Sequence, residues 1–314
     1  MAGGVTARRR FIAALLAAGL VAAACTSGGD DGEVSASGDA EATVTDDGQD
    51  GKAAAGDEGG SSGGGGSSGG GDGGSGDSTS GDGSVPPPTS PPPSGPSIDP
   101  AGSTGSYAPA YLRSAPATSI VIEVLTQDGA TLRSDSLEHA RSRLGQAAGK
   151  PVDTSGGTVA SSDREWTADE IRAASDASSG VAHTRERAVL RLLLLRGRAA
   201  GEGGERVLGM AVRGDTIAIF VDQVEGAGNP LLGVGAARIE KAVTLHEVGH
   251  LLGLVDIVLN TGREDPEHPG HSRNEDSVMY WAIESSLVAE LLGGGPPVEF
   301  DDADRRDLAT IAAS

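Results

Sequence analysis

A short motif of histidine and glutamate is the part of this sequence best suited to chemistry. His246, Glu247 and His250 form the pattern HExxH. If this segment is a helix, histidines at positions i and i+4 project from one face, and both rings can reach one zinc ion at roughly 2.0–2.1 Å. Glu247 lies beside them and can accept a proton from a water molecule that the metal activates. The motif therefore predicts a zinc site with a general base.

The residues after the motif extend the pattern to His246-Glu247-Val248-Gly249-His250-Leu251-Leu252-Gly253-Leu254-Val255-Asp256. Over this stretch the chain resembles the metzincin zinc metallopeptidases, and the Asp at its end is similar to that of the snapalysin-like members. The resemblance implies that the helix ends at Gly253, where a left-handed turn reverses the chain. It also implies that Asp256 is the third zinc ligand, where most metzincins place His.

Two further histidines leave the identity of the third ligand open. His268 and His271 follow the motif within a loop rich in Gly, Pro and charge. His271 is the alternative third ligand, and His268 is a weaker one, since exposed loop histidines or a secondary metal site explain them as well. A gluzincin-type site, with a downstream acid such as Glu275 as ligand, would leave Gly253 unexplained.

Met279 lies in the segment Ser277-Val278-Met279-Tyr280, which resembles the Met-turn of the metzincins. The resemblance implies that this methionine forms an apolar floor under the metal-binding imidazoles. No catalytic tyrosine is assigned.

The elements that position these residues all fall in the last two hundred residues. Alternating or continuous apolar runs predict strands at 120–125, 188–195, 207–212 and 216–224. Helical spacing and capping signals predict helices at 136–148, from Thr167 onward, at 236–253 and at 301–313. Together they predict an α/β (α+β) metzincin-like zincin domain over 108–314, with a twisted, mostly parallel mixed sheet, an active-site helix, the Met-turn and a C-terminal helix.

The first 107 residues predict export and a tether. Three arginines precede an apolar run over 11–24, and Val21-Ala22-Ala23-Ala24-Cys25 resembles the lipobox of bacterial lipoproteins. We therefore expect a signal peptide over 1–24, lipidation of Cys25, and a disordered Gly/Ser/Pro-rich tether over 25–107. The expected location is extracytoplasmic, anchored to the cell membrane, by either the Sec or the twin-arginine route.

Composition limits the classes of partner. The formal net charge of −21 argues against nucleic-acid binding. Cys25 is the only cysteine, so no intramolecular disulfide can form. Arg191, Arg196 and Arg198 are interpreted as a solvated rim, and His139 and His183 receive no role.

These observations predict a zinc-dependent endopeptidase that hydrolyses a protein or peptide substrate, with Glu247 as general base. The alternative is a non-catalytic surface lipoprotein whose structural zinc site supports binding of an envelope or extracellular partner. The number of protein ligands separates the two. Four protein ligands favour a structural site, whereas three ligands and one open position favour an enzyme.

Overall fold

The computed structural model describes residues 98–314. The predicted signal peptide, Cys25 and most of the predicted tether lie outside the described residues. Among the residues that are described, no helix is both long and apolar enough to cross a membrane.

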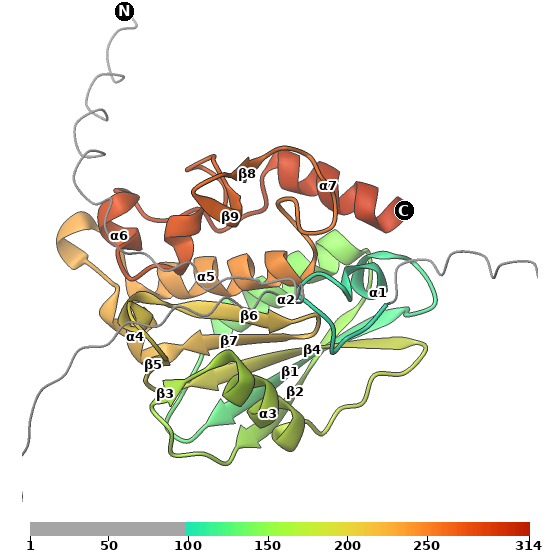
Figure 1. The fold of residues 1–314 in the computed structure, drawn as a ribbon, viewed down its shortest axis with the longest axis horizontal. Coiled ribbons are helices and arrows are strands. Elements are labelled where there is room, and N and C mark those ends of the chain that lie inside the picture. The colour runs from blue at the N-terminus through green and yellow to red at the C-terminus, as the bar shows by residue number, and fades with distance from the viewer. Residues whose placement is uncertain (1–97) are drawn as a thin grey trace, which may run out of the picture. The chain divides into compact units, whose positions relative to one another are not determined.

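A five-stranded sheet forms the centre of the fold, in the strand order β2-β1-β4-β7-β6 (Figure 1). Four strands are parallel, namely β1 (Ser119–Gln127), β2 (Val152–Val159), β4 (Arg187–Leu195) and β7 (Thr216–Phe220). The edge strand β6 (Gly209–Arg213) runs antiparallel to β7. Because β4 is covered on both faces, its residues are buried from Ala188 to Leu195, as expected for a continuous apolar run. The predicted mixed α/β class is confirmed.

Helices cover both faces of this sheet (Figure 1). Helices α2 (Ser134–Ala148) and α5 (Ala236–Leu251) lie side by side on one face, and α3 (Ala168–Ser178) lies on the other. The larger apolar core fills the space beneath α2 and α5, and a smaller one, which includes Trp166 and Phe220, lies beneath α3. The α5 helix is therefore anchored along its length, which fixes the direction of the side chains that it carries.

The predicted capping box at the start of α3 is present. Thr167 Oγ1 accepts a hydrogen bond from the Glu170 backbone N–H at 3.2 Å, and the Thr167 N–H donates to the Glu170 carboxylate at 2.7 Å. The closing helix α7 (Asp302–Ala313) begins in the same way, with Asp301 as its N-cap.

The C-terminal part of the chain lies over α5, on the side away from the sheet (Figure 1). It comprises β8 (Glu264–Asp265), β9 (His268–Ser272), the 3-10 helix η3 (Trp281–Glu284), α6 (Val288–Leu291) and α7. This layout places the residues before and after the predicted Met-turn directly above the helix with the HExxH motif.

Several elements differ from the sequence prediction. The predicted strand over 216–224 ends at Phe220, and its last residues form helix α4 (Val221–Gly226). Strand β2 was not predicted, because its sequence VDTSGGTV has no apolar alternation. The remaining short elements are α1 (Ala108–Leu112), β3 (Glu165–Trp166), β5 (Arg198–Ala199), η1 (Gly204–Arg206) and η2 (Pro230–Leu232).

The residues that precede the predicted start of the domain at 108 also contact the fold. The Gly214 N–H donates to the Gly102 carbonyl at 2.9 Å, and Thr104 Oγ1 donates to the Ala211 carbonyl at 3.3 Å. Residues 102–104 therefore lie against β6 and the turn that follows it.

Candidate metal centre

The α5 helix supplies the first two imidazoles of the site. His246 and His250 are one helical turn apart and both are buried, and their Nε2 atoms lie 3.0 Å apart. Two nitrogen ligands of one tetrahedral zinc ion, each at about 2.05 Å from the metal, would be separated by about 3.3 Å. The spacing of these two nitrogens is thus close to that of a shared metal.

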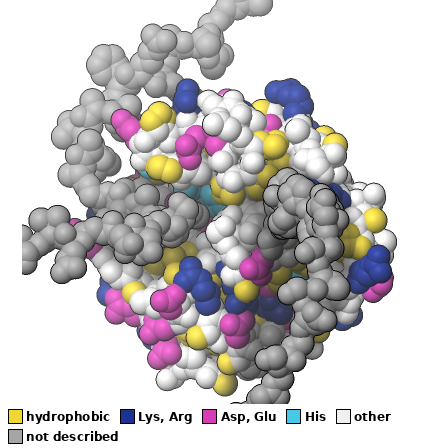
Figure 2. All heavy atoms as spheres, turned by 45° about the vertical axis from the view of Figure 1, so that its right-hand side comes forward, with side chains coloured by type: hydrophobic (Ala, Val, Ile, Leu, Met, Phe, Trp, Pro, Cys, Tyr) yellow, Lys and Arg dark blue, Asp and Glu magenta, His cyan; other side chains and the backbone are white. Residues whose placement is uncertain are grey.

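The third imidazole comes from strand β9. The ring of His271 lies 5.2 Å from that of His246 and 5.0 Å from that of His250, measured between ring centroids. One donor atom from each histidine and one carboxylate oxygen of Glu284 all lie within 4.8 Å of one another. We call these four residues, His246, His250, His271 and Glu284, the histidine group. Figure 2 shows histidine side chains within a hollow of the molecular surface.

Hydrogen bonds to backbone carbonyls orient two of these rings. His246 Nδ1 lies 2.7 Å from the Val278 carbonyl oxygen, and His271 Nδ1 lies 3.1 Å from the Pro269 carbonyl oxygen. A carbonyl oxygen only accepts, so we infer that each Nδ1 carries the proton and that each Nε2 presents a lone pair in the neutral ring. Such a bond on the outer nitrogen is the usual arrangement for a histidine that binds a metal through the other one.

The predicted Met-turn lies beneath the motif helix. Met279 is fully buried, its N–H donates to Ser277 Oγ at 3.1 Å, and its carbonyl accepts from the Ser272 N–H at 2.8 Å. A Cβ atom added at Gly249 would overlap the Met279 sulfur, so the turn lies in direct contact with the helix. The turn therefore connects α5 to β9, the strand that carries His271.

The helix ends as the sequence suggests. Gly253 has a φ of 81°, in the left-handed region, and the Leu254 N–H donates back to the Gly249 carbonyl at 3.1 Å. The chain reverses there, and a loop then leads to the β8–β9 hairpin.

Asp256, the preferred third ligand of the sequence prediction, is not in the histidine group. One oxygen of its carboxylate accepts from the N–H and the hydroxyl of Thr261, both at 2.6 Å, and the other accepts from the Glu264 N–H at 3.2 Å. Asp256 therefore organises the loop that leads into the hairpin, and the alternative, His271, lies beside the two motif histidines. The loop is long enough to bring a residue of β9 back to the helix, which the local spacing does not reveal.

His268, the weaker alternative, is also outside the group. Its ring stacks on Trp281 with centroids 4.3 Å apart, and its Nδ1 lies 3.1 Å from an Asp265 oxygen. This stack fixes the hairpin against η3. Glu275, the ligand of the gluzincin-type alternative, is exposed and is not part of the group.

Glu284 is the member of the group that the sequence did not predict. It is the last residue of η3, after the apolar run Trp281-Ala282-Ile283. A signal was present, since an acid closes an otherwise apolar segment five positions after the Met-turn methionine. Without a known three-dimensional position for this segment, however, that acid resembles any residue at the end of a short helix.

Glu247 is buried beside the group but does not belong to it. Neither of its carboxylate oxygens has a hydrogen-bond partner within residues 98–314. Its side chain lies against the start of β6, where a Cβ at Gly209 would come within 2.7 Å of Oε1. Burial raises the pKa of Glu247 well above its usual range, and the negative charge of Glu284 raises it further. Such a carboxyl group can both take up and release a proton near neutral pH.

The same burial keeps two imidazoles neutral. It lowers the pKa of His246 to about 4, and it lowers the pKa of His250 well below the usual value, with His246 and His271 adding to the effect in the second case. Burial opposes the protonation of His271 as well, but the Glu284 carboxylate raises its pKa overall. Neutral imidazoles are the form that binds a metal.

The residues present fit a zinc ion. Three imidazoles and a carboxylate are donors that zinc prefers, and they converge in a buried place. The buried nitrogens His250 Nδ1 and His271 Nε2 also lack hydrogen-bond partners among the described residues.

Comparisons with solved structures find proteins of similar fold. The chain is similar to archaemetzincin from Methanopyrus kandleri, with 18% identity, a TM-score of 0.42, and coverage of 63% of this chain and 97% of that one. It is also similar to archaemetzincin from Archaeoglobus fulgidus in complex with malonate (17% identity, TM-score 0.35, 62% and 99% covered). A third is a zinc-dependent peptidase from Methanocorpusculum labreanum (15% identity, TM-score 0.36, 60% and 99% covered). No protein-family profile and no curated protein matches the chain.

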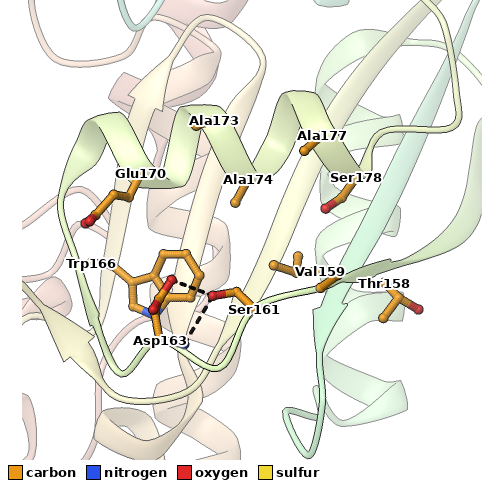
Figure 3. A pocket seen from close by; sticks show the side chains of 11 residues that line it. Thr158, Val159, Ser161, Asp163, Trp166, Glu170, Ala173, Ala174, Ala177 and Ser178 are labelled. Carbon is orange, nitrogen blue, oxygen red and sulfur yellow. Dashed lines mark hydrogen bonds between the residues drawn. The ribbon is translucent and has the colours of Figure 1, made fainter. Parts of the chain in front are cut away.

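A separate pocket lies on the other face of the sheet, between α3 and β2 (Figure 3). It has a volume of about 390 Å³ and is lined by small residues of α3, such as Ala174 and Ala177, and by Trp166. Its polar residues Ser161 and Asp163 are hydrogen bonded to each other. We assign no function to it.

Proposed function

We propose that this protein is a zinc-dependent endopeptidase in which His246, His250 and His271 bind the metal and Glu247 is the general base. The observation that carries the proposal is the position of Glu247, a buried carboxyl group without a hydrogen-bond partner in residues 98–314, next to the histidine group. A purely structural metal site has no need of such a group.

The residues of the chain divide the work of hydrolysis. When bound, zinc supplies the Lewis acidity that polarises a carbonyl and activates water. Glu247 would accept the proton of the attacking water and pass it to the leaving amine. The Val278 carbonyl holds the ring of His246 in place, and burial keeps competing protons off His246 and His250.

The Glu247→Gln variant tests the proposal in the full chain. General acid–base catalysis contributes about 10²–10⁴-fold, so we expect peptide hydrolysis to fall by that factor while one zinc per chain remains bound. Glu290→Gln, an exposed acid on α6, is the matched control and should cleave like the wild type. Cleavage by Glu247→Gln at the wild-type rate contradicts the proposal.

The third ligand is tested separately through metal binding. Loss of a partner outside the first coordination sphere already costs about 10–100-fold in metal affinity, so His271→Ala should weaken zinc binding by more than about 100-fold. His268→Ala, in the same hairpin, should leave the zinc dissociation constant almost unchanged. Equal losses in the two variants would rule out the assignment of His271.

One observation favours the second candidate, a non-catalytic protein with a structural zinc site. Glu284 offers a fourth protein donor, and four protein ligands are typical of structural sites. Under this alternative the wild type binds one zinc and cleaves no peptide, and removal of the metal unfolds the chain.

We also propose that the protein is exported and anchored in the membrane through a lipid on Cys25. The support is the sequence alone, namely the signal-like segment over 1–24 and the lipobox-like residues before Cys25. Metabolic labelling with a palmitate analogue should mark the wild type and not Cys25→Ser.

A further inference from the structure

We propose that Glu284 is a fourth protein ligand of the metal and that it closes the site in the resting protein. This inference rests on the metal site in the proposed function and goes beyond it, because it adds a ligand that a substrate must displace. It would make the enzyme latent, with a carboxylate of its own chain at the position that catalysis needs open.

The immediate surroundings of the Glu284 carboxylate suit a cation. Its oxygens lie 3.4 Å from His271 Nε2 and 3.9 Å from His246 Nε2. In the neutral rings both nitrogens carry lone pairs, because their Nδ1 atoms donate to carbonyl oxygens. Lone pairs and a carboxylate repel one another unless a positive charge lies between them.

No other cation of the described chain can meet this need. The ion pairs of residues 98–314 place no Arg or Lys within 4.0 Å of Glu284. A divalent ion among three neutral imidazoles carries two uncompensated charges in a buried place, and the carboxylate would remove one of them. Charge balance therefore favours Glu284 as a ligand.

The two acids of the site have different positions, which suit different roles. Glu247 is fully buried on α5 and lies outside the group of converging donors, whereas Glu284 is within that group. The side chain of Glu284 is 23% exposed, so it has a route to solvent. Glu247 is thus placed to act as the base and Glu284 to cover the metal.

The backbone of Glu284 is fixed while its side chain is not. Its carbonyl accepts from the Leu208 N–H at 2.8 Å, and the next residue, Ser285, forms a β-bridge with Val207. Rotation of the side chain would therefore uncover the metal without unfolding η3. A substrate carbonyl or a water molecule could then take the place that the carboxylate leaves.

Metal binding by the full chain tests this inference without reference to activity. We would compare wild type, Glu284→Gln, Glu284→Asp and the exposed control Glu290→Gln. The readouts are the zinc dissociation constant, from competition with a chromophoric chelator, and the visible absorption of the Co²⁺-substituted protein. We expect both Glu284 variants to bind zinc at least about tenfold more weakly, and to show altered Co²⁺ bands, because both remove a ligand.

The aspartate variant separates ligation from charge. It keeps the negative charge but withdraws the carboxylate by one methylene. If Glu284→Asp binds zinc and absorbs like the wild type while Glu284→Gln does not, Glu284 acts only by charge and the inference is overturned. Unchanged binding and spectra in both variants overturn it as well. Absence of peptidase activity with the expected metal results would instead contradict the proposed function alone.

Discussion

The domain contains two buried polar clusters, and they differ in whether the protein itself satisfies them. One is the histidine group. The other, which we call the arginine cluster, lies at the opposite part of the sheet and comprises Glu123, His183, Arg191, Arg213 and Asp215. In the arginine cluster, Asp215 pairs with both arginines and accepts from His183 Nε2 at 2.9 Å. Its charges are matched within the chain.

The histidine group has no such internal match. Its lone pairs converge on one point, and buried nitrogens of two rings have no partner among the described residues. A satisfied cluster stabilises one fold, whereas an unsatisfied one with convergent donors is a site that waits for a ligand. The comparison thus separates a structural role from a functional one, although both clusters contain histidines and acids.

Removing the central acid of the arginine cluster should have the largest effect on stability. Asp215→Ala leaves Arg191 and Arg213 buried without their main partner, so the free energy of unfolding should fall by about 3–5 kcal/mol. Urea unfolding of the metal-free protein measures this, with the exposed Asp153→Ala as control. Zinc affinity of the folded variant should stay unchanged, and a parallel loss of zinc binding would show that the two clusters are coupled.

A third buried acid, Asp304, gives the comparison a pH dependence. Asp304 lies under the Met-turn, where it contacts Ser277 Oγ at 3.3 Å and Arg263 at 3.2 Å. Burial raises the pKa of Asp304 to about 6, and the charge of Asp301 adds to the shift. Between about pH 4 and 6 the folded protein holds a proton that the unfolded chain has released, so the free energy of unfolding falls as the pH rises. Across this window the loss should be about 2–3 kcal/mol.

Asp215 should respond with the opposite sign. Burial opposes it, but hydrogen bonds from His183 and Thr216, together with the two arginines, hold the pKa of Asp215 below its usual value. Its contribution is therefore constant above about pH 4 and is lost only as the pH falls through the lowered pKa. Urea unfolding of wild type and Asp304→Asn at pH 4.5 and 6.5 separates the terms. A parallel change in the two proteins would show that Asp304 does not titrate in this range.

The smallest effect is expected at Asp256, which supports the histidine group from outside. Asp256→Ala loses the bonds to Thr261 and Glu264 that shape the loop before the hairpin, so zinc binding should weaken by no more than about tenfold. Asp256→Asn keeps an oxygen acceptor and should weaken it less. A loss in Asp256→Ala as large as in His271→Ala would restore Asp256 as the ligand.

The sequence predicted those parts of the site that depend on local periodicity. Helical spacing was sufficient to place His246, Glu247 and His250 on one buried stretch of α5, and the continuous apolar run was sufficient to predict β4. His271 depends instead on how a long loop closes, and Asp256 had the spacing of a ligand but a different set of partners. Glu284 depends on the pairing of residues 284–286 with residues 206–208, which no local pattern encodes.

The same limit applies to charged residues of the interior. Arg191 was predicted to be part of a solvated rim, yet it is buried, because Asp215 from the β6–β7 turn lies against it. His183 received no role from the sequence, but its Nδ1 accepts from the Val189 N–H at 3.2 Å while its Nε2 faces Asp215. Contacts between distant segments decide the burial of such residues.

The contact between Gly249 and Met279 has a consequence for which sequences can support this site. HExxH leaves two positions unspecified, yet here the second of them has no space for a side chain, because the methionine sulfur occupies it. A larger residue would displace the turn and, with it, the Val278 carbonyl that orients the His246 ring. For this fold the informative motif is therefore HExGH together with its methionine, and a relative that changes one of the two residues should carry a compensating change at the other.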